Sequence, residues 1–152
     1  MEREKIKLLI KRYEDVYLFA TKRISSLISE NVLKELSLEQ YSMLRIIYFQ
    51  GPLRAAELSE QLNVNKSAIT SKVDKLETKG FIKRERDQND RRNIYITATE
   101  EGKKVCEEVE IKIEKFVSHY LEELDPDDLE EFINLYEKIS TIIQNSKEGD
   151  TL

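Results

Sequence analysis

Residues 55–102 read AAELSEQLNVNKSAITSKVDKLETKGFIKRERDQNDRRNIYITATEEG, and this stretch decides the fold. Its first half predicts two short helices, over about 55–62 and 65–79, with a turn of about three residues between them. Asn63 tolerates the left-handed conformation that a tight turn requires. Asn65 is a good N-cap for the second helix. This order and spacing are typical of a helix-turn-helix.

The second half of the stretch predicts a β-hairpin. Gly80 ends the second helix, and the alternating stretches 82–86 and 92–97 predict two strands joined by the polar loop 87–91. Leu53 and Arg54, which follow a Gly-Pro stop, can add a short strand to this hairpin. The whole is therefore a winged helix-turn-helix. A helix of this kind fits the major groove of duplex DNA, and cations beside it can lie over phosphates.

Long helices flank the winged segment on both sides. Apolar residues recur in steps of three and four over about 3–35, which predicts a long amphipathic helix. Ser37 and Gln40 form a capping-box pattern for a further helix that runs to about Phe49. Behind the hairpin, Thr99 can cap another long helix.

A final helix is expected to start at Pro126, which suits a first helical position. The first and last helices carry more apolar surface than a small winged domain can cover, which favours a homodimer over a helical layer packed on a monomer. The expected fold is mainly α with a small β-hairpin wing. We expect a single domain over 1–152, with a winged helix-turn-helix DNA-binding part over 53–98 and dimerisation helices over 1–36 and 99–146.

Composition limits the class of protein. With 39% hydrophobic and 36% charged residues, the 152-residue chain is typical of a soluble, helix-rich protein. It has no apolar run long enough for a membrane helix, and its charged N-terminus does not resemble a signal peptide. The single Cys106 fits a reducing cytoplasm, and one Cys with one His cannot form a zinc-type cluster. We expect a cytoplasmic protein that needs no cofactor, no metal and no membrane.

The net charge of −5 conceals a positive winged segment. Residues 63–97 carry nine basic and five acidic side chains, net +4, whereas residues 98–152 carry six basic and sixteen acidic ones, net −10. Attraction to phosphates depends on the local charge, so the acidic C-terminal part does not exclude a nucleic-acid partner.

Three parts of the sequence together resemble the MarR family of bacterial transcription regulators. They are the helix text NKSAITSKVDKLETKGFI, the loop DQNDRR, which matches an Asp-x-x-Asp-Arg-Arg pattern, and ATEEG, which matches a Leu-Thr-x-x-Gly helix start with Ala98 in the leucine place. The flanking helices extend the resemblance over nearly the whole chain. It implies a triangular homodimer whose terminal helices interlock and whose two winged parts face one side of double-stranded DNA.

The helix 65–79 is the expected recognition helix. Ile69, Val73 and Leu76 should point inward, so that the N-terminal half turns small polar side chains towards the groove floor. Its strongest candidates for hydrogen bonds to base edges are Asn65 and Lys66, so specificity can lean on DNA shape. The full set of expected DNA contacts on this helix is Asn65, Lys66, Ser67, Ala68, Thr70, Ser71, Lys72 and Lys75.

The hairpin loop is the second expected DNA contact. Arg91 at its tip should enter the minor groove, where a narrow groove concentrates negative potential. The resemblance implies that a wing aspartate braces a wing arginine, and the alternative is a merely mixed-charge loop. The expected wing residues are Arg84, Arg86, Asp90, Arg91 and Arg92, with Asp87 as a second carboxylate.

The resemblance also implies control by a small phenolic or lipophilic ligand between the dimer helices and the winged part. The candidate pocket residues are Tyr13, Tyr17, Tyr41, Met43, Ile47 and Tyr48, although aromatic residues at helical spacing are more often core. Cys106 is expected to be a small buried hydrophobe rather than a redox sensor.

The expected function is sequence-specific repression at an inverted-repeat operator, because a dimer bound over a promoter excludes polymerase. The rival hypothesis is a winged-helix adaptor or antagonist that contacts protein and not DNA. An enzyme is not expected, since Cys106 and His119 lie about 20 Å apart on one helix and cannot form a dyad within one subunit. Nor does the sequence contain a Gly-rich phosphate loop.

Overall fold

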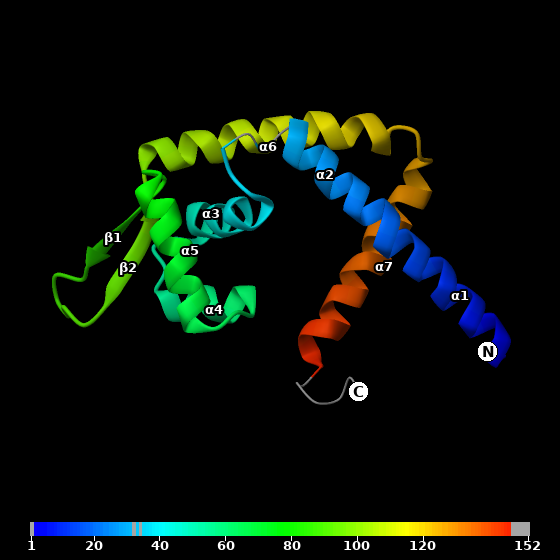
Figure 1. Ribbon diagram of the computed structural model, residues 1–152, viewed down its shortest axis with the longest axis horizontal. Helices are drawn as coiled ribbons and strands as arrows, with labels where there is room; N and C mark the ends of the chain where they lie inside the picture. Colours follow the sequence, from blue (N-terminus) through cyan, green and yellow to red (C-terminus); the bar gives the residue numbers. More distant parts are fainter. Residues whose placement is uncertain (1, 32, 34, 147–152) are drawn as a thin grey trace. The chain divides into compact units, whose positions relative to one another are not determined.

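The computed structural model describes residues 2–31, 33 and 35–146. The chain divides into two units, Met1–Ile113 and Glu114–Leu152. The elements of the first unit and their order along the chain can be followed in Figure 1.

The N-terminal helix is continuous but changes its winding in the middle. It consists of α1 (Arg3–Asp15), a π-helical segment η1 (Val16–Thr21) and α2 (Lys22–Asn31). The long helix expected over about 3–35 is confirmed, but it ends earlier, because the chain has left the helix at Leu33, whose side chain is buried. Exposed apolar side chains cover this helix, among them Leu8, Leu9, Ile10, Tyr13, Val16, Tyr17, Leu18, Phe19 and Ile24.

Three helices form the body of the winged part. They are α3 (Leu38–Gln50), α4 (Ala55–Leu62) and α5 (Lys66–Thr78). The predicted capping box is confirmed, since Ser37 Oγ accepts from Gln40 N and Ser37 N donates to Gln40 Oε1. The core between them holds Met43, Leu44 and Ile47 of α3, Leu58 of α4, and Ile69, Val73 and Leu76 of α5. Leu62, at the end of α4, is only half-buried.

The hairpin pairs β1 (Ile82–Arg86) with β2 (Ile94–Ala98) as antiparallel strands, with Ile82 opposite Ala98. The predicted second strand over 92–97 began two residues too early. Asn93 N donates to Asp90 O and Asp87 N donates to Asn93 O, so the chain is still closing its turn there. Leu53 pairs with Ile96 through two backbone hydrogen bonds, as the sequence predicted.

The helix α6 (Glu100–Leu121) starts in close contact with the residues that enter β1. Thr99 N donates to Phe81 O, and Thr99 Oγ1 both donates to Gly80 O and accepts from Gly102 N. A Cβ atom at Gly102 would lie 1.9 Å from the Phe81 carbonyl oxygen. Only glycine therefore allows this approach.

The last helix, α7 (Pro126–Asn145), has Pro126 at its first position, as predicted, and Asp125 as its N-cap. It buries none of its residues, and Phe132, Ile133, Leu135, Tyr136, Ile139, Ile142 and Ile143 are exposed. None of the described helices is long and apolar enough to span a membrane.

Candidate nucleic-acid interface

The turn between α4 and α5 is fixed by two asparagines. Asn63 adopts the left-handed conformation with φ of 50°, and Val64 N donates to Ser59 O. Asn65 caps α5, because its Oδ1 atom accepts from Ala68 N and from Ser67 Oγ, both at 2.8 Å. The Asn65 oxygen is therefore occupied within the protein, which limits what it can offer to a base edge.

The outward face of α5 consists of small polar side chains. Ser67, Thr70 and Ser71 are exposed and Ala68 is half-buried, whereas the inward positions are fully buried. This face forms an open, shallow hollow of about 590 Å³, and its lining residues are Gln40, Ser67, Thr70, Ser71, Asp74, Lys75, Thr78 and Lys79. Side chains of this size leave the helix narrow enough to approach another surface closely.

The lysines of α5 divide into free and engaged groups. Lys66 and Lys75 are exposed and take part in no ion pair among the described residues. Lys72 instead pairs with Glu39 at the start of α3, with 3.2 Å between Nζ and Oε2. Lys79 donates to Glu35 O at 2.5 Å and to Gln40 Oε1 at 2.9 Å. Lys72 and the C-cap residue Lys79 thus hold α5 against the segment around the start of α3.

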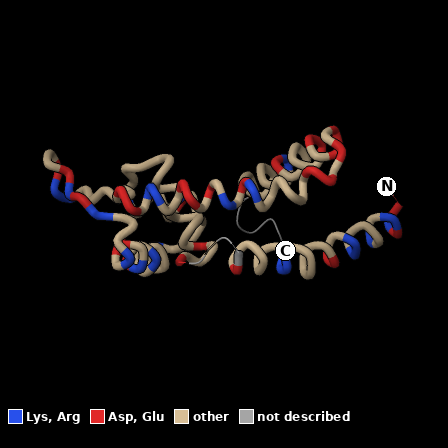
Figure 2. The backbone as a smooth tube through the Cα atoms, turned by 90° about the horizontal axis from the view of Figure 1, so that it is seen from above, with Lys and Arg blue, Asp and Glu red and all other residues tan. Residues whose placement is uncertain are grey.

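Opposite charges alternate around the loop between β1 and β2, as Figure 2 shows. Asp90 accepts from the backbone N of Arg92 and from its guanidinium, with Oδ1 3.1 Å from Nε. This contact with Arg92 holds the pKa of the Asp90 carboxyl below its usual value. The Arg86 guanidinium donates to the backbone oxygen of Arg91. The Arg91 side chain is not used in this bond and is exposed at the tip of the loop.

Arg84 lies apart from the other wing arginines that the sequence grouped with it. Its guanidinium reaches back from β1 to α5, with NH2 2.6 Å from Asp74 Oδ1 and NH1 2.8 Å from Glu77 Oε1. Its side chain is 28% exposed, compared with 92% for Arg92. Arg84 is therefore an internal contact between strand and helix, which the sequence did not predict.

The six candidate pocket residues fall into three groups by exposure. Tyr13 and Tyr17 stack on each other and are 60% and 58% exposed on the N-terminal helix. Tyr41, Met43 and Ile47 are buried in the core, which was the alternative that aromatic spacing left open. Tyr48 is half-buried, and its hydroxyl donates to Glu107 at 2.7 Å. A different hollow has a volume of about 250 Å³ and is lined by Leu33, Glu35, Leu36, Glu101, Lys104, Val105, Glu108, Val109 and Lys112.

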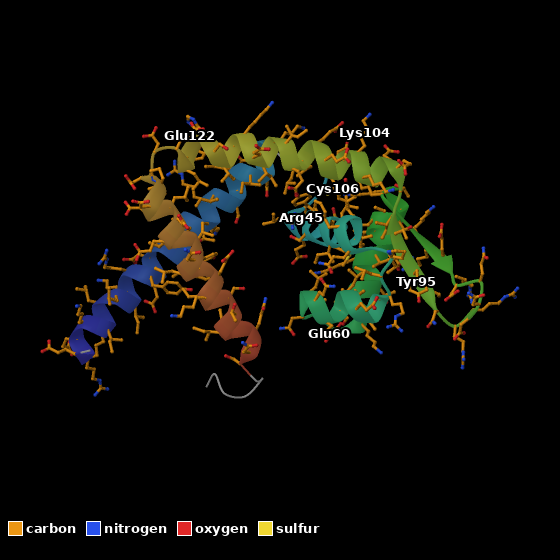
Figure 3. The ribbon with its side chains drawn as sticks, turned by 180° about the vertical axis from the view of Figure 1, so that it is seen from behind. Arg45, Glu60, Tyr95, Lys104, Cys106 and Glu122 are labelled. Atoms are coloured by element: carbon orange, nitrogen blue, oxygen red, sulfur yellow. The ribbon has the colours of Figure 1, made fainter. Side chains whose placement is uncertain are left out.

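A polar ladder joins α3 to α6 beside Cys106. The Tyr41 hydroxyl donates to Glu110, and Arg45 Nε donates to the same carboxylate at 2.7 Å. Figure 3 shows Arg45 on α3 and Cys106 on the side of α6 that faces it. Burial raises the pKa of the Cys106 thiol to about 11, and burial followed by the bond to Glu110 raises the pKa of Tyr41. Cys106 is a fully buried residue, as the sequence predicted.

The part of the chain that the structure describes contains no group of three or more His, Cys, Asp and Glu side chains arranged to hold a metal ion. The surface around α5 and the hairpin thus offers small hydroxyls and cations. Such groups can contact a polyanion by hydrogen bonds and charge.

Comparison with known proteins agrees with this geometry. The model of the MarR family matches residues 36–94. The HTH-type transcriptional regulator YpoP of Bacillus subtilis, itself uncharacterized, is 40% identical over 100 residues, which cover 65% of this chain and 71% of YpoP. The HTH-type transcriptional repressor MdtR of the same organism is 30% identical over 105 residues, covering 66% of this chain and 68% of MdtR. The crystal structure of the transcriptional regulator BldR from Sulfolobus solfataricus has a TM-score of 0.69 and 29% identity, covering 93% of this chain and 99% of BldR.

Proposed function

The chain belongs to the MarR family of transcriptional regulators, and we propose that it acts as a homodimer that binds an inverted-repeat operator in duplex DNA and represses transcription. The observation that carries this proposal is the outward face of α5, where Ser67, Thr70 and Ser71 are exposed between the free cations Lys66 and Lys75. Hydroxyls can bond either base type at the floor of a major groove while the lysines contact phosphates.

The hairpin loop supplies the second contact. Arg91 enters the minor groove, and Arg86 contacts the adjacent backbone. Asp90 is tolerated near phosphate because Arg92 neutralises it. With Lys66, Lys75, Arg86 and Arg91 as phosphate ligands, a dimer has eight cations on DNA, so the affinity should fall about 10⁴-fold between 50 and 200 mM salt.

Dimerisation uses the apolar faces that a single chain leaves uncovered. On α7 these are the residues around Phe132, Tyr136 and Ile139, and on the N-terminal helix those around Leu9 and Tyr17. Exposed apolar surface of this extent is typical of an interface. Repression follows from position, because a dimer seated over a promoter excludes polymerase. The relative MdtR is a transcriptional repressor, which supports the same direction of control.

Control by a small lipophilic effector is part of the proposal, but with fewer contacts than the sequence predicted. An effector could reach Tyr13, Tyr17 and Tyr48 without unpacking the core, whereas Tyr41, Met43 and Ile47 would first have to lose their buried contacts. The hollow of about 250 Å³ beside Leu33 and Val109 is a preformed space that such a ligand could enter in this unit.

The test is selection of binding sites from a random pool of duplex DNA with the purified protein. Enrichment of an inverted repeat whose half-sites lie about one helical turn apart supports a dimeric operator-binding regulator. A pool that stays unenriched at low salt contradicts the proposal and favours a winged helix that contacts protein.

A further inference from the structure

We propose that Arg84 is a positioning residue for DNA binding: it fixes the orientation of the β1–β2 hairpin relative to α5 and does not itself contact phosphate. The inference rests on the proposed function, because it explains how two elements that meet different grooves are held at one spacing. It also reassigns a residue that the sequence grouped with the DNA-contacting cations.

The position of Arg84 in β1 directs its side chain towards the helix. Alternate residues of a strand share one face, so Arg84 lies on the same face as Ile82, which is buried. Across the hairpin Arg84 is paired with Ile96, which is also buried. The neighbours Lys83 and Glu85 lie on the other face, where they are exposed and pair with each other at 2.9 Å.

Two carboxylates on α5 receive the guanidinium. Asp74 and Glu77 are three residues apart, so they lie on one side of the helix. Each accepts from a different terminal nitrogen of Arg84, at 2.6 Å and 2.8 Å. A planar guanidinium holds two such partners in a fixed geometry, whereas a lysine ammonium has no fixed fork of donors.

The charges at this contact do not favour phosphate. One guanidinium faces two carboxylates, so the cluster of Arg84, Asp74 and Glu77 has a net charge of −1. Asp74 also lines the hollow on the outward face of α5, beside Thr70 and Ser71. Arg84 therefore neutralises acidic groups next to the positions that are proposed to meet the DNA.

The small size of the sheet explains why the hairpin needs a contact with α5 to keep its orientation. The hairpin has two five-residue strands with one added bridge at Leu53, and a hairpin of two strands is marginally stable without packing against another element. The tie from Arg84 to α5 adds to the packing of the buried Ile82 and Ile96 near the middle of β1. With it, Arg91 at the tip and the face of α5 keep one separation.

The test compares two variants with the same change in charge. Asp74→Asn with Glu77→Gln removes the partners of Arg84, and Glu60→Gln with Glu101→Gln removes two exposed carboxylates on α4 and α6 that form no ion pair among the described residues. Affinity is measured for the selected duplex and for a scrambled duplex of the same composition, with melting temperature as a check on folding. If Arg84 acts through position, the first variant binds the selected duplex about tenfold more weakly than the second, comparable to losing one base-pair contact, while both bind the scrambled duplex alike.

Arg84→Lys, which keeps the charge but not the fork, should fall between the wild type and Arg84→Gln on the selected duplex. If Arg84 instead contacts phosphate directly, Asp74→Asn with Glu77→Gln should bind both duplexes more tightly, because it frees Arg84 from its carboxylates. That result, or equal behaviour of the two double variants, overturns the inference.

A second readout does not depend on DNA. Amide hydrogen exchange of the free protein should accelerate over residues 82–98 in Asp74→Asn/Glu77→Gln and stay unchanged in the control double variant, with α3 unaffected in both. If the wild type selects no DNA site, the proposed function fails on its own, and exchange still decides whether the contact holds the hairpin. Unchanged exchange in the first variant contradicts the positioning role.

Discussion

Lys72 on α5 forms an ion pair with Glu39 at the start of α3, and the lysine side chain is 29% exposed while the glutamate is 77% exposed. The cation thus sits between the two helices with its charge partly neutralised. Exposed ion pairs contribute at most about 1 kcal/mol, so a phosphate can compete with Glu39 for this lysine. The pair sets how much of the charge of α5 is available to DNA.

Glu39→Gln should release Lys72 to the DNA. We expect about threefold tighter binding to the selected duplex and a salt dependence steeper by about 0.9 for each lysine that gains a phosphate. The measurement is a titration at several salt concentrations. Glu60→Gln is the matched control, because it adds the same charge on α4 without freeing a lysine, and identical salt slopes for the two variants would disprove the release.

Substitutions at Asn65 should separate its cap from any role in base reading. Asn65→Ala removes the acceptor for Ala68 N and should cost about 1 kcal/mol of unfolding free energy. Asn65→Asp keeps the acceptor, so stability is retained, but its negative charge beside the DNA weakens binding. Urea unfolding and DNA titration test the two effects independently. An Asn65→Ala protein as stable as the wild type contradicts the capping role.

Arg91→Ala should weaken DNA binding while leaving the dimer intact. The expected loss is about tenfold, with a salt slope lower by about 0.9 per protomer. Lys83→Ala is the control, since it removes a cation from the outer face of the same hairpin. Sedimentation checks the dimer, and an Arg91→Ala protein that binds its site as tightly as the wild type removes the wing from the mechanism.

Ending the chain after Asp125 should abolish the dimer, because it removes the exposed apolar face of α7. Sedimentation velocity should then report a monomer whose helical circular dichroism still melts cooperatively. A chain ending after Asn145 keeps α7 and should remain dimeric. If the shorter chain still sediments as a dimer, the interface lies elsewhere.

The buried Cys106 thiol should make the free energy of unfolding fall as the pH rises above 9. Burial raises the pKa of the folded thiol to about 11, above its ordinary value of 9.0, so the unfolded chain ionises first as the pH rises. The stabilisation is complete below pH 9 and falls by about 1.4 kcal/mol per unit of pH above it. Urea midpoints at pH 7.5, 9 and 10 measure this fall, which should be shallower in Cys106→Ala. The fall in stability that remains in Cys106→Ala is attributed to Tyr41, whose pKa is also raised in the folded protein. An equally steep fall in both proteins contradicts the assignment.

Local signals in the sequence predicted most of the fold. The caps at Ser37, Asn65 and Thr99 act within three residues, so they can be recognised from sequence alone, and each lies where it was expected. The inward positions Ile69 and Val73 follow from helical periodicity in the same way. The start of β2 could not be predicted in this way, because it is set by backbone hydrogen bonds that join Asn93 to Asp87 and to Asp90.

Contacts between distant segments could not be predicted. Arg84 was expected to face the DNA, yet its partners lie on the preceding helix α5. The alternation of residues along a strand does not indicate which carboxylates of another element its side chains will contact. The bond from Tyr41 to Glu110 joins residues 69 positions apart. Such pairs depend on how helices pack, which composition and periodicity do not specify.

The absence of a side chain at Gly102 has a consequence for how motion spreads through the winged part. The first turn of α6 rests directly on the Phe81 backbone, with no rotatable group between them to absorb a displacement. Phe81 in turn joins the end of α5 to β1. A tilt of this turn of α6 should therefore displace the Phe81 backbone directly, and with it the start of the hairpin.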